Sequence, residues 1–122
     1  MKLRIKGNSI RYRLTRTDVS NLAANGYLEE QTNFLDGRFI YALQTDAGIT
    51  ELKATYSNNK ITMFVPASFV KNWPANDVVG CNAKMPLSES TSLYLLLEKD
   101  FVCLDESTED QSDNFDNPNK TC

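Results

Sequence analysis

The chain has 122 residues, 41% of them hydrophobic, and a net charge of −3, which suits one domain with a single core and is too short for two ordinary domains. No apolar run approaches the roughly 20 residues that a membrane span needs, and charged residues interrupt the N-terminus where a signal peptide would be apolar, so we expect a cytoplasmic protein without a membrane partner. Histidine is absent, which removes catalytic triads, the helical zinc-protease motif and the usual neutral-pH general base. We therefore favour a binding role over catalysis and expect no cofactor.

The first 14 residues alternate basic and apolar side chains, with the pair Gly7-Asn8 between two runs. Period-two alternation around such a pair predicts two antiparallel strands joined by a two-residue turn. Thr15 and Asp18 then form a capping-box pattern, and Gly26 is a helix stop, so we expect a helix over residues 16–25. Strands over 27–34 and 38–46 follow, with a turn at Asp36-Gly37.

The pattern then starts again. The stretch "TELKATYSNNKITMFVPASFVKNWPANDVVG" aligns with the first section at a constant offset of 51 residues, and "LYLLLEKD" aligns with "FIYALQTD". Such self-similarity indicates one supersecondary unit used twice. The second helix should be shorter, because Pro66 suits its start and Pro74 ends it. Between them, Phe69, Val70 and Trp73 are expected in the core.

These elements predict an α+β fold of two ββαββ repeats, about 1–49 and 50–104, within one globular domain over 1–104. Two arrangements of the strands remain open: a mainly antiparallel sheet of about eight strands, or a closed eight-stranded barrel, each with two short helices. Residues 105–122 are acidic and poor in apolar side chains, and we interpret them as a tail.

Three stretches, "KGNSIRYRL" near the start, "LEKDF" with Cys103, and "NFDNP" with Cys122, resemble the landmarks of an uncharacterised bacterial family of small proteins, a domain of unknown function. The similarity spans nearly the whole chain. It implies a bacterial single-domain protein. Because the family has no established activity, the resemblance assigns no role to any residue.

Charge is segregated along the chain. Residues 1–16 hold six bases and no acid, residues 17–100 hold six bases and ten acids, and residues 101–122 hold one base and six acids. A two-residue turn at Gly7-Asn8 would place every base of the hairpin on one face and set Arg4 opposite Arg11. Like charges directly opposite cost about 0.2–1 kcal/mol per pair unless an anion neutralises them. The candidate anion-binding residues are Lys2, Arg4, Lys6, Arg11 and Arg13.

Two functions compete for this hairpin. In the first, it binds an anionic small molecule such as a phosphate compound, for which arginine supplies forked donors. In the second, the protein is an interaction or structural module whose hairpin pairs with its own acidic tail or that of another copy. A simpler interpretation is that Glu29, Glu30, Glu51, Glu98 or the tail satisfies the bases internally. We do not expect nucleic acid, because the chain is acidic overall and Tyr12, the one interleaved aromatic, should face the core.

Other residues carry weaker signals. Cys81, Cys103 and Cys122 are too few and too widely spaced for a disulfide framework, and without histidine they predict no zinc site. The acidic run "DESTEDQSDNFD" lacks the glycine and the spacing of an EF-hand loop. Phe39, Tyr41 and Tyr94 lie in strongly apolar stretches and are expected in the core.

Overall fold

The computed structural model describes residues 1–101 and 112–116. Its elements follow the order ββαββ twice, with a short 3-10 turn after the second helix. The first half contains β1 (Lys2–Lys6), β2 (Ser9–Leu14), α1 (Arg16–Asn25), β3 (Tyr27–Phe34) and β4 (Gly37–Asp46). The second contains β5 (Lys53–Ser57), β6 (Lys60–Pro66), α2 (Ala67–Val70), η1 (Trp73–Ala75), β7 (Gly80–Pro86) and β8 (Ser92–Lys99).

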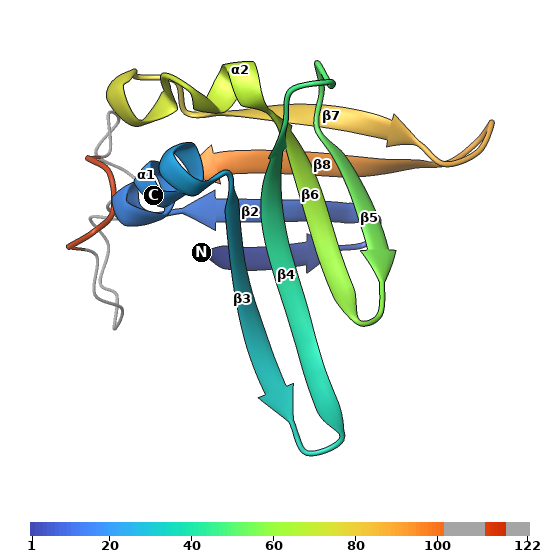
Figure 1. Cartoon of the computed structure of the whole chain (residues 1–122). Coiled ribbons are helices and arrows are strands. Elements are labelled where there is room, and N and C mark those ends of the chain that lie inside the picture. The colour runs from blue at the N-terminus through green and yellow to red at the C-terminus, as the bar shows by residue number, and fades with distance from the viewer. Residues whose placement is uncertain (102–111, 117–122) are drawn as a thin grey trace.

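The eight strands form two four-stranded sheets that run across one another (Figure 1). Sheet A has the order β1-β2-β8-β7, and sheet B has the order β3-β4-β6-β5. Each sheet therefore combines one hairpin from each half of the chain. The central pairs β2–β8 and β4–β6 are parallel, and the four hairpin pairs are antiparallel.

The predicted α+β class and the mainly antiparallel pairing are confirmed, but the single sheet and the closed barrel are wrong. No strand pairing joins sheet A to sheet B in the described part of the chain. The outer strands β1, β7, β3 and β5 therefore remain edges. In each sheet, one parallel strand pair joins a hairpin of the first half to a hairpin of the second half. The two sheets bury their apolar faces against each other, as in orthogonally packed sandwiches.

Strand register follows the internal alignment of the sequence. In sheet A, Ser9 pairs with Tyr94 across β2 and β8; in sheet B, the corresponding pair is Lys60 with Ile40. These positions differ by 51 residues on one strand and 54 on the other, as the aligned stretches require. The two halves thus use the same backbone geometry, which makes their side chains directly comparable.

Helix α1 begins and ends where the sequence predicts. The Thr15 hydroxyl accepts a hydrogen bond from the Asp18 amide at 3.2 Å, and the Asp18 carboxylate accepts one from the Thr15 amide at 3.0 Å. Gly26 ends the helix with φ of 73°, a left-handed conformation that glycine adopts without strain. In the second half, α2 has only four residues and no side-chain cap, because Pro66 occupies the position that corresponds to Thr15.

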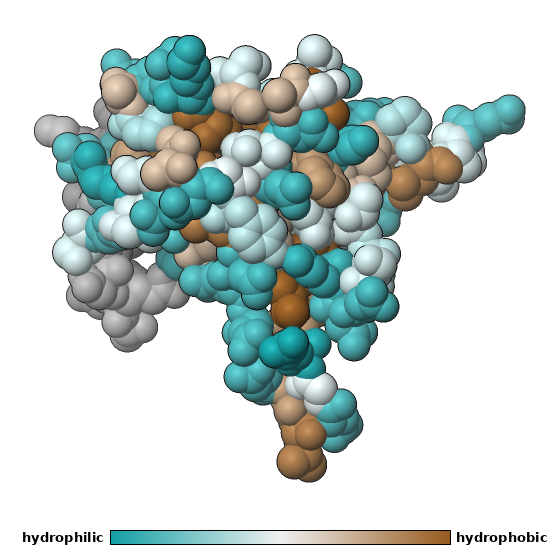
Figure 2. Space-filling view, in the orientation of Figure 1, coloured by the Kyte–Doolittle hydropathy of each residue, from teal (hydrophilic) through white to brown (hydrophobic). Residues whose placement is uncertain are grey.

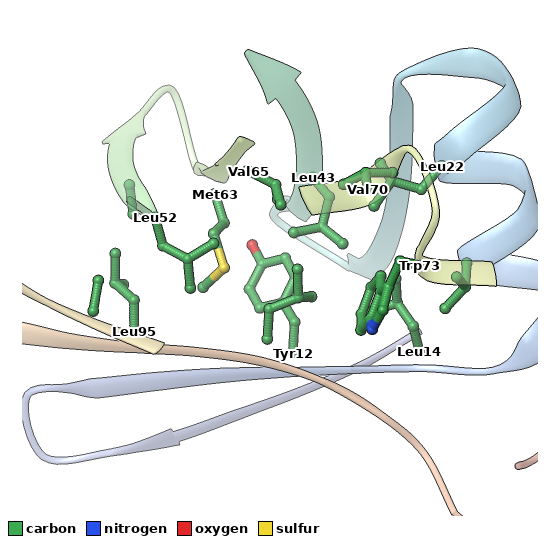
Figure 3. Close-up of a cluster of buried hydrophobic side chains, with 14 of the residues drawn as sticks. Tyr12, Leu14, Leu22, Leu43, Leu52, Met63, Val65, Val70, Trp73 and Leu95 are labelled. Carbon is green, nitrogen blue, oxygen red and sulfur yellow. The ribbon is translucent and has the colours of Figure 1, made fainter. Parts of the chain in front are cut away.

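The core lies between the two sheets (Figure 3). Tyr12 on sheet A meets Tyr41 on sheet B edge to face, with ring centroids 6.1 Å apart. Trp73 is fully buried, and its indole N–H donates to the Val78 carbonyl at 2.7 Å. Other fully buried side chains are Leu14, Val19, Leu22, Leu43, Met63, Val65, Leu95 and Leu97. As predicted, Val70 is also buried, while Phe69 is partly buried beside Trp73.

Part of the predicted tail packs against the domain. Phe115 is buried, and its amide donates to the Asp100 carbonyl at 2.8 Å. The Asp113 carboxylate accepts hydrogen bonds from Thr17 at the start of α1. The Phe115 ring lies 4.8 Å from the ammonium of Lys99, which donates to a backbone carbonyl, and burial lowers the pKa of that ammonium. Residues 112–116 thus close the end of sheet A beside α1 (Figure 1); the rest of 105–122 lies outside the described residues.

One hairpin extends beyond the body of the molecule. The β3–β4 arm projects from sheet B and ends in a hydrophobic tip, visible in Figure 2. At this tip, Phe34 and Leu35 are exposed. The turn itself consists of Leu35 and Asp36, one residue earlier than the predicted Asp36-Gly37, because Gly37 already pairs with Phe34 as the first residue of β4.

Candidate functional site

The side chains that β1 and β2 turn away from the core are basic. The predicted register is confirmed at every position, from Lys2 opposite Arg13 to Lys6 opposite Ser9. On the inner face of β2, Tyr12 and Leu14 are fully buried. We define the basic face as the outer face of sheet A; its charged side chains are Lys2, Arg4, Lys6, Arg11, Arg13, Lys84 and Glu98.

Glu98 is the one acid on this face among the described residues of the four strands. It lies on β8 in the same row as Arg13, and one carboxylate oxygen approaches Arg11 Nε at 2.9 Å and Arg13 Nε at 3.0 Å. This confirms one of the internal partners that the sequence suggested. A single carboxylate serves two guanidinium groups, so their combined charge is only half neutralised.

Arg11 is incompletely satisfied. Its Nε atom is buried and makes no well-directed hydrogen bond, although the distance to Glu98 is that of an ion pair. Directly opposite Arg11 is Arg4, a second cation. The centre of the basic face therefore holds more positive charge and more donor capacity than Glu98 can use.

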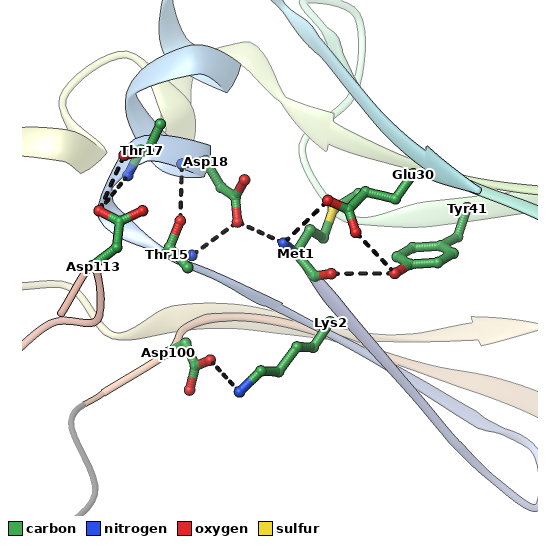
Figure 4. A network of polar contacts seen from close by, with 9 residues as sticks. All are labelled: Met1, Lys2, Thr15, Thr17, Asp18, Glu30, Tyr41, Asp100 and Asp113. Carbon is green, nitrogen blue, oxygen red and sulfur yellow. Dashed lines mark hydrogen bonds and ion pairs between the residues drawn. The ribbon is translucent and has the colours of Figure 1, made fainter. Parts of the chain in front are cut away.

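Lys2 lies at the edge of the basic face and pairs inside the molecule. Its ammonium is 3.0 Å from the carboxylate of Asp100, a side chain that is 93% buried. The neighbouring Met1 ammonium lies 2.8 Å from Asp18, and the Met1 carbonyl accepts from Tyr41 (Figure 4). These contacts anchor the start of β1 against α1 and sheet B, so Lys2 is a poorer candidate for binding a ligand than the sequence predicts.

A groove of about 310 Å³ runs along the basic face beside the first hairpin. Arg4 and Lys6 are exposed there, and neither forms an ion pair with any residue that the structure describes. The groove brings together three of the five predicted residues, while Lys2 and Arg13 do not line it. Its lining is Arg4, Lys6, Ser9, Ile10, Arg11, Tyr94 and Leu96.

Tyr94 was expected in the core, and this prediction is wrong. Its side chain is 53% exposed, while Leu95 and Leu97 on the same strand are fully buried. The run "LYLLLEK" conceals the alternation because both faces of β8 are apolar over most of its length. Glu98 is the signal that reveals it: a charged residue faces outward, and period two then places Leu96 and Tyr94 beside it. Phe39 and Tyr41 do pack partly buried against the core.

A second groove, of about 360 Å³, lies beside Cys81 and is lined by Thr50, Glu51, Phe69 and their neighbours. Burial raises the pKa of the Cys81 thiol to about 11. At neutral pH this thiol is protonated, and a protonated thiol is a poor nucleophile. Cys103 and Cys122 lie outside the described residues.

Neither a metal centre nor a spanning helix emerges from the described ranges 1–101 and 112–116. No three His, Cys, Asp or Glu side chains there gather as metal ligands would. Within the same ranges, every helix is too short or too polar to cross a membrane.

Comparison with known proteins identifies a family. No curated protein and no solved structure is similar enough to match the chain. A family model does match, over residues 1–119. The match includes the stretches "KGNSIRYRL" and "LEKDF", which carry the family resemblance. Because the matched region covers nearly all of the 122 residues, the chain belongs to the family of unknown function DUF7009.

Proposed function

We propose that the protein is a non-enzymatic binding domain and that its basic face holds an anionic ligand, such as a phosphate compound. The observation that carries this proposal is the pairing of Arg4 directly opposite Arg11, whose one nearby acid, Glu98, is shared with Arg13. Lys6 adds a third cation to the same groove. A bound anion would relieve the repulsion between the opposed arginines and occupy donors that Glu98 leaves unused.

The second half of the chain supports this proposal. Arg4 and Arg11 correspond to Thr55 and Thr62, which are paired opposite each other on sheet B. The same strand geometry therefore forms without the arginines. The fold does not need the opposed arginines, and their repulsion costs free energy. A bound anion is the best explanation for their presence.

Arginine chemistry favours oxyanions. A guanidinium group presents planar, forked N–H donors that match phosphate or carboxylate oxygens, and Lys6 supplies a point charge beside them. Glu98 is the internal competitor for Arg11. Replacing Glu98 by glutamine should therefore strengthen binding of an added anion.

The test is a ligand-induced thermal shift, confirmed by calorimetry, with phosphate, pyrophosphate and triphosphate as probes. A ligand that binds the native state raises apparent stability by mass action. The variant R4T/R11T removes the opposed pair. Its matched control, R38T/K53T, also removes two positive charges, but from exposed positions on sheet B.

We expect a saturable shift in the natural protein that disappears in R4T/R11T and persists in R38T/K53T. Loss of the shift in both variants would mean that net charge alone attracts the anion. No shift with any probe would contradict the proposal.

The alternative function is an interaction module in which the hairpin pairs with the acidic tail of its own chain or of another copy. The docking of Phe115 onto Asp100, whose carboxylate contacts Lys2, brings the tail to the edge of the basic face and favours this alternative. Truncation would remove Phe115 from the core. A better test neutralises four upstream acids (D105N/E106Q/E109Q/D110N) and leaves 112–116 intact. Lower stability or loss of a dimer in this variant, without anion binding by the natural protein, would favour the interaction module.

A further inference from the structure

We infer that the anion is attached to a flat aromatic ring: the ligand is a small aromatic phosphate, the class that includes nucleoside monophosphates. This inference rests on the proposed anion site. It adds that the ring lies on Tyr94 and Leu96 while the phosphate contacts Arg4, Lys6 and Arg11. All five side chains line the same groove.

The rows of sheet A place these groups at a suitable separation. Tyr94 pairs with Ser9, which pairs with Lys6, so two strand spacings separate the tyrosine from the lysine. Neighbouring strands lie about 4.8 Å apart, which puts the two backbones about 10 Å apart. Leu96 and Arg4 are related in the same way through Arg11. Arg4 and Lys6 thus line one side of the groove, Tyr94 and Leu96 line the other, and Arg11 lies on the strand between them.

The Tyr94 ring is available for stacking. It is 53% exposed, and within the described chain it makes no ring–ring or cation–π contact, unlike Tyr12, Tyr27 and Tyr41. An exposed tyrosine beside a half-buried leucine offers an apolar surface that would stay exposed to solvent when an inorganic anion binds. A planar ring would cover it, and aromatic stacking on such a platform is favourable.

The size of the groove limits the ligand. At about 310 Å³ it lies at the small end of ligand pockets, so one ring system with one charged group suits it better than a long chain. Sheet B supports the assignment of an aromatic ligand to sheet A. At the matched positions of sheet B, Ile40 replaces Tyr94, and threonines replace Arg4 and Arg11. The aromatic side chain and the two arginines therefore occur together on sheet A and are together replaced at the matched positions of sheet B.

The experiment measures binding of inorganic phosphate, phenyl phosphate and adenosine monophosphate to the full chain by calorimetry. Ribose 5-phosphate serves as the ring-free partner of the nucleotide. The variants are Y94I, which installs the residue of sheet B, and Y94F, which retains the ring. Both substitutions lie on an exposed face, and thermal unfolding verifies that each variant is folded.

We expect phenyl phosphate to bind about tenfold more tightly than inorganic phosphate, in line with the usual strength of base–aromatic stacking. The same preference should separate adenosine monophosphate from ribose 5-phosphate. Y94I should abolish the preference while retaining phosphate binding, and Y94F should keep it.

The outcomes separate this inference from the proposed function. If phosphate binds but the aromatic phosphates bind no better, the inference fails and the anion site stands. An aromatic preference that survives in Y94I also overturns it, because the ring would lie elsewhere. Binding of a single-stranded oligonucleotide without the mononucleotide would overturn the small-molecule assignment. If no probe binds, both proposals fall.

Discussion

The outer faces of sheets A and B have equivalent backbones and different chemistry. At matched positions, sheet A carries Arg4, Arg11 and Tyr94 where sheet B carries Thr55, Thr62 and Ile40. Glu98, the acid of the basic face, corresponds to Gln44. On sheet B, Lys60 donates to the Tyr27 hydroxyl at 2.6 Å, and that hydroxyl donates to Glu29 at 2.9 Å, so its polar groups satisfy one another.

The buried positions of the two halves behave differently from these outer faces. Val19 and Val70 correspond and are both buried, and so are Leu22 and Trp73. Leu22 and Trp73 differ in size, but both are apolar, because each half must cover the apolar face of the other. The repeat therefore constrains the core and leaves the outer faces free to diverge. The opposed arginines are the divergence on which we base the proposal that the outer face of sheet A binds a ligand.

The largest effect that we predict comes from a glycine that allows the two strands at the edge of sheet A to approach. A Cβ at Gly80 would overlap the Leu97 carbonyl oxygen and lie 2.7 Å from the Glu98 Cα. Backbone atoms cannot move aside as a flexible side chain can. G80A should lower the free energy of unfolding by about 3 kcal/mol, as in other overpacked sites, measured by urea denaturation.

The control for this prediction is G48A, because a Cβ at Gly48 would meet only the Asp46 side chain, at 3.3 Å. Gly80 pairs with Glu98 on sheet A, and on sheet B the corresponding partner of Gln44 is Tyr27, a far larger residue. If G80A were as stable as G48A, the close approach of β7 to β8 would not constrain β8. The position of Glu98 beside the arginines would then not depend on Gly80.

A smaller effect should come from exchanging charge between the two faces. R4T removes a cation that opposes Arg11 and breaks no ion pair with a described residue. We expect it to raise the free energy of unfolding by about 0.2–1 kcal/mol at low salt. The double variant T55R/T62R should cost a similar amount by creating the opposed pair on sheet B.

Salt provides the check on this exchange. Both effects should shrink as the ionic strength rises, because exposed charges are screened. Urea denaturation at low and high salt measures them. If R4T were destabilising at low salt, Arg4 would already be neutralised by a partner within the molecule, and the argument for an external anion would lose its basis.

Much of this comparison could be predicted from local sequence. The register of the first hairpin follows from Gly7-Asn8 and the alternation around it, and α1 follows from Thr15, Asp18 and Gly26, because each of these signals depends only on near neighbours. The alignment of the two halves could also be found in the sequence, because it compares the same local signals at a constant offset. The candidate cations could be named because charge in an alternating strand must lie on one face.

The assembly could not be predicted, because it depends on contacts between distant segments. Alternation shows which side of a strand is apolar, but it does not show that β2 pairs with β8 and β4 with β6. The prediction that Tyr94 lies in the core was wrong for this reason. In a strand that is apolar on both faces, only the neighbouring strands decide which face is buried. Similarly, Asp100 can be recognised as the partner of Lys2 only when the end of β8 is placed beside the end of β2, the strand that pairs with β1.

The last effect is absent at neutral pH and arises only at alkaline pH, from a position in the core where the two halves of the chain carry different side chains. Tyr12 and Tyr41 meet between the sheets, where the second half places Met63 and Leu95. Burial, and then the Glu30 carboxylate, raise the pKa of Tyr41 to about 12 from an ordinary value of 10.0. The folded protein therefore holds this proton more tightly than the unfolded chain. By linkage, Tyr41 contributes stability that is fully present below pH 10 and is lost as the pH rises toward 12.

The variant Y41F tests this assignment, because phenylalanine keeps the ring and cannot ionise. Its stability should fall less steeply than that of the natural protein between pH 10 and 12, measured by urea denaturation at each pH. The control is Y56F on the outer edge of sheet B, where Tyr56 is 65% exposed; it should leave the slope unchanged. Tyr12, whose pKa burial also raises, keeps part of the alkaline decline in Y41F. Equal slopes in Y41F and the natural protein would mean that Tyr41 ionises as readily folded as unfolded, and the pair between the sheets would then be looser than its geometry indicates.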